Sequence, residues 1–193
     1  MLFDSTTGGS TSLILRLREN ESLAWNQFVE LYAPLVFHWC NECNLQSCDA
    51  ADVMQDVFSK AARSISQFQS RRNGTLRGWL WTITQNQIRD FWRKKNREVN
   101  AAGGTDANLR FANVVDRIDD EPTTEFENSR LLHRALEQIE SDFQAQTWTA
   151  FWRSAIEGHN TAWIAEDLGL SLNSVRQAKS RVLRRLREQL GES

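Results

Sequence analysis

Residues 161–187 read TAWIAEDLGLSLNSVRQAKSRVLRRLR, and this stretch predicts two helices joined by a tight turn. Apolar residues recur at three- and four-residue steps on both sides of Gly169, which permits the turn. Thr161 and Ser171 are suited to cap the two helices, and the small Ala165 lets them approach closely. The pattern is typical of a helix-turn-helix, although an ordinary helical hairpin would share it.

The second helix of this pair carries its polar side chains on the side opposite to Val175, Ala178 and Val182. Amide and guanidinium groups at the start of such a helix can form paired hydrogen bonds with adenine or guanine in the major groove. The candidate residues for binding duplex DNA are Asn173, Ser174, Arg176, Gln177, Lys179, Ser180, Arg181 and Arg184.

The charge of the chain is unevenly distributed. Its 193 residues have a formal net charge of −2, which would ordinarily argue against a nucleic-acid partner. However, cations are concentrated in residues 89–97 and 176–187, and the second patch contains no acidic residue. Two concentrated basic patches on an otherwise acidic protein indicate a polyanionic partner, although a solvated helix face is the alternative for either patch alone.

The first basic patch ends the stretch GWLWTITQNQIRDFWRKKNR, residues 78–97. On a helix, Leu80, Ile83 and Phe91 would face a core, and Trp81 and Trp92 would pack beside them. Asn86, with the arginines of the patch, would occupy the polar side. Trp79, at the border of that side, is the best candidate for an exposed ring.

Nearly every other long segment also has helical periodicity. Pro34 lies inside an apolar stripe and predicts a kink or break there. A further helix is expected to begin near residues 47–49, and a polar loop is expected over residues 67–74. Residues 98–123 lose the periodicity and read as a linker, and the Ser/Thr/Gly-rich residues 1–12 read as a disordered tail.

Composition excludes several classes of protein. Hydrophobic residues make up 40% of the chain, enough for a core, and no apolar run approaches the ~20 residues that span a bilayer. The start of the chain does not resemble a secretion signal, so we expect a cytoplasmic protein without membrane insertion. Its three cysteines make a disulfide framework improbable.

Three motifs in order resemble those of bacterial RNA polymerase sigma factors of the extracytoplasmic-function class, within the sigma-70 family. Residues 52–58, DVMQDVF, resemble the core-binding motif of that family. Residues 77–93 resemble its region for the −10 promoter element, and residues 161–187 resemble its helix-turn-helix for the −35 element. The resemblance spans residues 12–188, and the joint order is far more specific than any single motif.

The resemblance implies that the front half of the chain captures separated DNA. A cationic groove and planar side chains hold single strands, and stacking contributes ~1–3 kcal/mol per base. Asn86 would bind a flipped base, with residues 67–74 forming part of its pocket. The implied residues for the −10 element are Arg77, Trp79, Asn86, Arg89, Arg93, Lys94 and Lys95.

The helix that carries DVMQDVF would have a different partner. By resemblance, its anionic and partly apolar face binds a basic coiled coil of the polymerase large subunit. A solvated helix with its apolar residues in the core is the alternative. The implied residues for core polymerase are Asp49, Asp52, Gln55, Asp56, Val57 and Phe58.

The sequence therefore predicts an all-α fold of two small helical domains joined by a flexible linker. The expected parts are a tail (1–12), region 2 (13–97), a linker (98–123) and region 4 (124–190) with the helix-turn-helix. The implied partners are core RNA polymerase, promoter DNA and an anti-sigma factor or other inhibitor. The resemblance implies no enzymatic activity, no cofactor and no metal.

Two other functions compete with this interpretation. Cys40, Cys43 and Cys48 with His38 could form a metal or redox sensor, but four residues within eleven positions seldom complete a structural zinc site. Alternatively, the chain is a stand-alone helix-turn-helix regulator that binds duplex DNA as a dimer. An enzyme is less consistent with the sequence, which lacks a carboxylate cluster or a nucleophile flanked by arginines.

Overall fold

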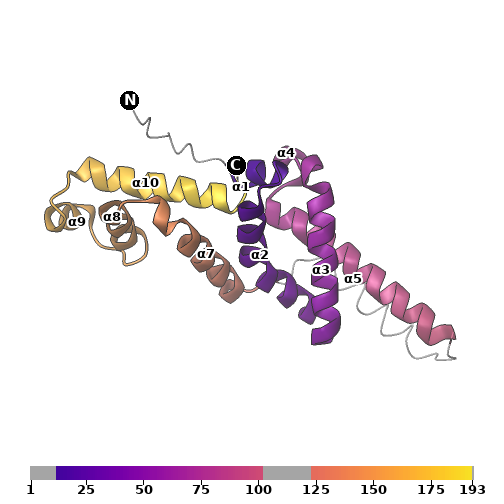
Figure 1. Cartoon of the computed structure of the whole chain (residues 1–193). Coiled ribbons are helices and arrows are strands. Elements are labelled where there is room, and N and C mark those ends of the chain that lie inside the picture. Colours follow the sequence, from indigo (N-terminus) through magenta and orange to yellow (C-terminus); the bar gives the residue numbers. More distant parts are fainter. Residues whose placement is uncertain (1–11, 102–122, 193) are drawn as a thin grey trace.

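The computed structural model describes residues 12–101 and 123–192, and these residues fold into helices without any strand (Figure 1). The predicted all-α class is confirmed. The predicted tail, apart from Ser12, and most of the predicted linker lie outside the described residues. The structure also shows no helix, among those described, that is long and apolar enough to cross a membrane.

The N-terminal unit is built on three long helices. Its elements are α1 (Leu13–Arg18), α2 (Ser22–Glu42), α3 (Ser47–Ser64), η1 (Ile65–Gln67), α4 (Ser70–Asn73) and α5 (Leu76–Ala101). Large side chains with no exposed surface fill the space between the long helices, among them Phe28, Trp39 and Leu80. Aromatic rings bury the most area per residue, so they dominate the stability of this core.

Three local expectations for this unit need correction. The predicted kink or break at Pro34 does not interrupt α2, which continues to Glu42. Leu31 and Leu35 beside it are fully buried, and such packing can offset the one hydrogen bond that proline removes. The predicted loop at residues 67–74 is largely taken up by the short η1 and α4 and ends at Gly74, whose φ is 71°. Helix α5 continues past residue 97 to Ala101.

The C-terminal unit consists of four helices among the described residues. They are α7 (Glu125–Ile139), α8 (Ala145–Ala155), α9 (Thr161–Asp167) and α10 (Leu172–Gln189), with η2 (Glu140–Asp142) between the first two. The Thr124 hydroxyl accepts a hydrogen bond from the amide of Glu127 and caps α7. Between α8 and α9 the residues Gly158, His159 and Asn160 are all exposed, and Gly158 has a φ of 72°.

The two units share one hydrophobic core. Leu131, Ala135 and Ile139 of α7 are buried in the same cluster as Phe28 and Leu31 of α2. In Figure 1, α7 and the end of α10 reach α2, and the helix-turn-helix lies at the far side from the tip of α5. The described parts of the two units therefore pack against each other through one continuous cluster of buried side chains.

Candidate nucleic-acid interface

The helix-turn-helix consists of α9 and α10. Gly169 lies in the turn with a φ of 64°, a conformation that side chains disfavour, as its place in the sequence predicts. The Ser171 hydroxyl accepts a hydrogen bond from the Ser174 amide (3.0 Å) and caps α10, as expected. Helix α9 is capped by Asn160 instead of Thr161, through a bond from the Ala162 amide (2.8 Å).

Small residues hold the two helices together. Ile164, Ala165, Val175, Ala178 and Ala150 of α8 form a separate buried cluster. Alanine at three of these positions leaves little side-chain volume between the helix axes, so they can approach closely. The buried stripe of α10 fixes which side of this helix faces solvent.

The predicted duplex-binding residues lie on the solvent side of α10. Ser174 is half-buried, and its hydroxyl lies 2.8 Å from that of Ser171. Arg181 donates a long hydrogen bond to Gln177 (3.4 Å), and Arg184 lies 4.0 Å from Glu188. The remaining side chains of the set are also exposed: Asn173, Arg176, Lys179 and Ser180.

The predicted single-strand surface lies on α5. Asn86 is exposed, as a residue that binds a flipped base needs to be. Trp79 is only half-buried, but its ring packs on Phe68 at a centroid distance of 5.2 Å, so one face is covered. Trp81 is buried against Trp39, so its ring is not available to a DNA base. Of these two tryptophans, Trp79 is the more accessible for the predicted stacking on a base.

Most cations of α5 have partners within the protein. Arg93 forms an ion pair with Asp90 (2.6 Å), and Lys95 forms one with Asp49 of α3 (3.0 Å). Arg77 donates a hydrogen bond to the side chain of Asn128 in α7. Lys94 is exposed, and Arg89 is half-buried. Binding of a phosphate by Lys95 therefore requires it to exchange a carboxylate partner.

The acidic side of α3 faces both solvent and α5. Asp52, Gln55 and Asp56 are exposed, whereas Asp49 is half-buried under Lys95. A groove between α3 and α5 is lined by the three aspartates together with Asp90, Lys94 and Lys95. The predicted polymerase surface and the predicted DNA surface therefore border the same groove.

The apolar members of the predicted polymerase surface have other neighbours. Val57 is fully buried, and Phe58 is half-buried with its ring 5.6 Å from that of Phe28. Because Val57 has no exposed surface, its side chain packs α3 onto the core and does not contact a partner in this arrangement. The surface that α3 offers to a partner is acidic and amide-bearing rather than apolar.

Part of the N-terminal unit is similar to a known protein family. Residues 28–98, from α2 to α5, match the family model of sigma-70 region 2. Over 175 residues, 88% of this chain, the sequence is 29% identical to "ECF RNA polymerase sigma factor SigE" of Mycolicibacterium smegmatis (strain ATCC 700084 / mc(2)155). The segment from α2 to α5 therefore belongs to the sigma-70 region 2 family. The whole chain spans 62% of the length of the relative SigE.

The cysteines of the chain differ in reactivity. Burial raises the pKa of Cys40 to about 12, with a further contribution from Cys43, and raises that of Cys43 to about 11, with a contribution from Glu42. Both thiols are therefore protonated at neutral pH, while Cys48 is exposed. No group of three or more potential ligands gathers in a metal-binding arrangement within residues 12–101 and 123–192.

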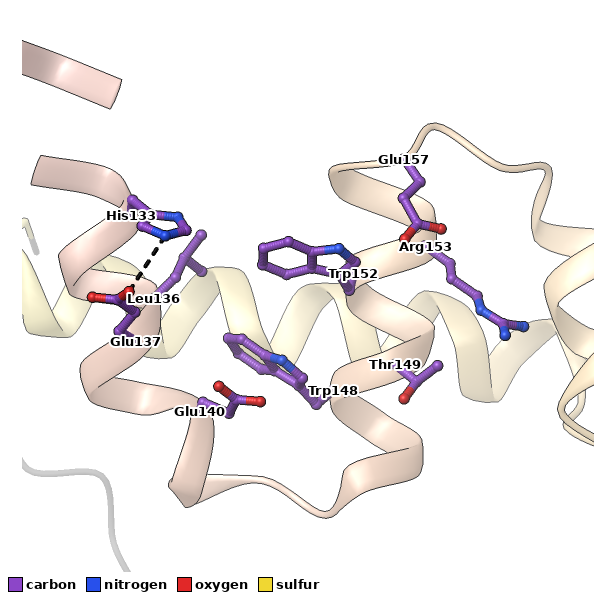
Figure 2. Close-up of a pocket in the computed structure, with 9 residues that line it drawn as sticks. All are labelled: His133, Leu136, Glu137, Glu140, Trp148, Thr149, Trp152, Arg153 and Glu157. Carbon is purple, nitrogen blue, oxygen red and sulfur yellow. Dashed lines mark ion pairs between the residues drawn. The ribbon is translucent and has the colours of Figure 1, made fainter. Parts of the chain in front are cut away.

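Sequence reasoning missed a pocket between α7 and α8 (Figure 2). Its volume is about 440 Å³, and Trp148 and Trp152 form its apolar wall. His133 lies 3.3 Å from Glu137 at its rim, where Glu140 and Glu157 add further carboxylates. The four-residue spacing of Trp148 and Trp152 predicts that they share one face of a helix. The sequence does not show that α7 lies opposite this face and closes it into a pocket.

A second missed feature is Trp163 on the first helix of the helix-turn-helix. Its side chain is 46% exposed, and its ring lies against the tilted ring of His159 with centroids 4.6 Å apart. The Arg153 guanidinium lies over the same ring, 5.4 Å from its centroid. Arg153 also pairs with Asp167 across α9. These contacts hold the outer side of α9 in place next to the predicted duplex-binding residues of α10.

Proposed function

We propose that this chain is a transcription initiation factor that binds core RNA polymerase and directs it to specific promoters. In this proposal, α5 recognises and helps to melt the −10 element, and α10 recognises the −35 element. The units correspond to residues 13–97 and 124–190. The proposal includes an anti-sigma factor or another inhibitor as a further partner.

The observation that carries the proposal is the presence of two different cation-bearing faces on one chain. Arg176 and Lys179 project from the recognition helix of a helix-turn-helix, which suits the major groove of a duplex. Asn86 and Lys94 project from α5 within a unit that matches sigma-70 region 2, where tryptophan rings lie close by. Promoter opening requires one surface that recognises duplex DNA and another that holds a single strand.

The acidic side of α3 supports a separate site for polymerase. Asp52 and Asp56 are exposed, and a basic helical partner would gain charge-complementary contacts there. Charge reversal of Asp56 should therefore weaken polymerase binding without changing the binding of isolated DNA. Gln55 offers an amide at the same surface.

The decisive test is reconstitution. The purified chain is added to sigma-free core polymerase, and transcript starts are mapped across the genome of its source. We expect defined starts with a common pair of upstream elements, lost in Asn86→Ala and shifted or lost in Arg176→Ala. An absence of defined starts with correctly folded protein would contradict the proposal.

The alternative of a stand-alone dimeric regulator predicts a different result. Such a protein would bind a two-fold symmetric duplex site tightly without polymerase and would sediment as a dimer. We expect instead a monomer that selects promoters only together with core polymerase.

A further inference from the structure

The pocket between α7 and α8 has an aromatic wall that its neighbours hold in place. Trp148 and Trp152 are both half-buried, and their ring centroids lie 6.1 Å apart. Phe143 stacks on Trp148 at a centroid distance of 6.2 Å. Phe151 is almost fully buried, and its ring lies 5.4 Å from that of Trp148. Because these contacts already order the wall, a ligand would lose little free energy in ordering it.

Three carboxylates surround this wall, those of Glu137, Glu140 and Glu157. In Figure 2, Glu140 lies at one end of the two tryptophan rings and Glu157 at the other. Glu137 lies 3.3 Å from His133. Glu157 lies 3.2 Å from His159. Glu140 has no ion-pair partner among residues 12–101 and 123–192, so its charge is available to a ligand.

Arg153 also lines the pocket, but its charge is directed elsewhere. Its guanidinium pairs with Asp167 and lies 5.4 Å from the ring centroid of Trp163. Figure 2 shows the Arg153 guanidinium pointing away from the two tryptophans of the wall. The carboxylates therefore dominate the potential at the opening of the pocket, which repels anions and attracts cations.

A cation in this pocket would lie against indole rings. Indole gives the strongest cation–π attraction among aromatic side chains, within about 6 Å of the ring centroid. A primary ammonium or a guanidinium would lose hydrogen bonds to water that an indole face does not replace. A quaternary ammonium has no N–H group to leave unsatisfied, and carboxylates at the rim can balance its charge without direct contact.

The size of the pocket favours a small molecule over a helix of a partner protein. Its volume of about 440 Å³ lies in the usual range of small-molecule sites, about 300–1,000 Å³. A single turn of α-helix with its side chains already occupies a volume of about 450 Å³. Leu136 is 4% exposed and adds apolar surface from α7, so part of the ligand should be apolar.

We propose that the pocket between α7 and α8 binds a small organic cation, a quaternary ammonium compound with an attached apolar group. The ammonium lies against Trp148 and Trp152, the apolar group packs on Leu136, and Glu140 contributes a balancing carboxylate. The inference does not depend on the proposed function, because no contact with DNA or polymerase enters it. Since the ligand touches both helices, its binding stabilises the packing of α7 on α8.

Two-dimensional ¹H–¹⁵N NMR spectra of the full chain locate the ligand, because each of the eight tryptophans gives its own indole N–H signal. Trp148→Phe and Trp152→Phe assign the two signals of the pocket. We expect choline to shift these two signals in a saturable way and to leave the signals of the buried Trp39 and Trp81 unchanged. Shifts spread evenly over all the indoles, or no shift at the two pocket indoles, would overturn the proposal.

The requirement for a positive charge is tested with 3,3-dimethylbutan-1-ol, which has the shape of choline with carbon in place of the charged nitrogen. We expect this alcohol to bind about five- to thirty-fold more weakly than choline. Protonated ethanolamine should also bind more weakly, because its N–H groups lose contact with water. Equal or tighter binding of either compound would contradict a site for quaternary ammonium.

Glu140→Gln removes one carboxylate of the pocket at nearly constant size, and Glu166→Gln on α9 is its matched control. Both glutamates are exposed, and neither has an ion-pair partner within the described ranges, so both variants should fold normally. We expect Glu140→Gln to weaken the binding of choline about two- to five-fold and Glu166→Gln to leave it unchanged. If the two variants bind choline equally, the pocket carboxylate plays no part and the proposal fails.

A basic side chain of a partner protein is the competing occupant, and the same titration distinguishes it. The amides of N-acetylated arginine and lysine represent such side chains, and benzyltrimethylammonium represents the proposed ligand with its apolar group. We expect benzyltrimethylammonium to bind at least about three-fold more tightly than choline, because its ring buries additional apolar area. It should also bind more tightly than both amides. Tighter binding of either amide would replace the small-molecule site with a site for a protein.

Discussion

Helices α5 and α10 are both basic, but they hold their cations differently. On α5, Arg93 and Lys95 are paired with carboxylates of the N-terminal unit. On α10, Arg176 and Lys179 have no ion-pair partner among the described residues. A free cation attracts phosphate directly, whereas a paired cation must first exchange its partner. In the proposed function, α10 would therefore bind phosphate directly, whereas α5 would first exchange the partners of its ion pairs.

The two helices also carry apolar residues that differ in burial. Truncation of a buried residue to alanine should give the largest loss of stability. Ile88 of α5 has no exposed surface, so Ile88→Ala should lower the free energy of unfolding by about 2–5 kcal/mol. The matched change on α10, Leu172→Ala at a residue that is 48% exposed, should cost less than about 0.5 kcal/mol. Urea denaturation measures both, and similar losses would contradict the difference in burial.

Substitutions of Arg176 test whether α10 binds duplex DNA. Loss of a base contact should cost about 1–3 kcal/mol in binding to the −35 duplex, so we expect Arg176→Ala to bind about five- to 150-fold more weakly. Arg176→Lys keeps the charge but loses the forked geometry, so it should retain the salt dependence and lose selectivity. Fluorescence anisotropy at several salt concentrations distinguishes the two variants. Unchanged selectivity in both would remove Arg176 from the duplex surface.

The start of α10 depends on a capping bond that α3 lacks. Because the Ser171 hydroxyl accepts from the Ser174 amide, Ser171→Ala should lower the free energy of unfolding by about 1 kcal/mol. Gln46 occupies the same position at α3 but makes no side-chain capping bond, so Gln46→Ala is the control and should be nearly neutral. Thermal unfolding measures the two variants. An equal shift in both would show that the cap contributes nothing.

The paired state of α5 is tested by Asp49. Its ion pair with Lys95 is partly exposed, with 25% and 43% of the two side chains accessible, so it contributes less than about 1 kcal/mol. Asp49→Asn should leave stability nearly unchanged and strengthen binding to single-stranded −10 DNA by about two-fold, because Lys95 is released. Lys94 has no such partner in residues 12–101 and 123–192, so Lys94→Gln should weaken that binding for every sequence alike. A weaker interaction in Asp49→Asn would contradict the exchange of partners.

The sequence predicts α10 better than α5 because its information is local. The apolar spacing, Gly169 and Ser171 lie within one short stretch, and the structure confirms the turn, the cap and the buried stripe. The sequence predicts Thr161 as the cap of α9, one residue after the observed cap Asn160, because both residue types favour this position. Single-residue choices of this kind depend on backbone geometry that composition does not reveal.

Contacts between distant residues could not be predicted from a single sequence. Lys95 and Asp49 are separated by 46 positions, and Arg77 and Asn128 by 51. Periodicity shows that α5 has a polar side but not which helix faces it. Gly191 has the appearance of an ordinary residue after a helix, and only the position of Leu76 shows why a side chain does not fit there.

The exposed residues Gly158, His159 and Asn160 separate α8, which is packed into the shared core, from the helices of the helix-turn-helix. Exposed connections with small and polar residues are where proteases first cut folded domains. A single nick at this connection would break the covalent link between α9 and the shared core but leave the N-terminal unit intact. Helices α9 and α10 would then stay attached to the rest of the protein only by packing, through Val182 and Leu186 of α10 in the shared core.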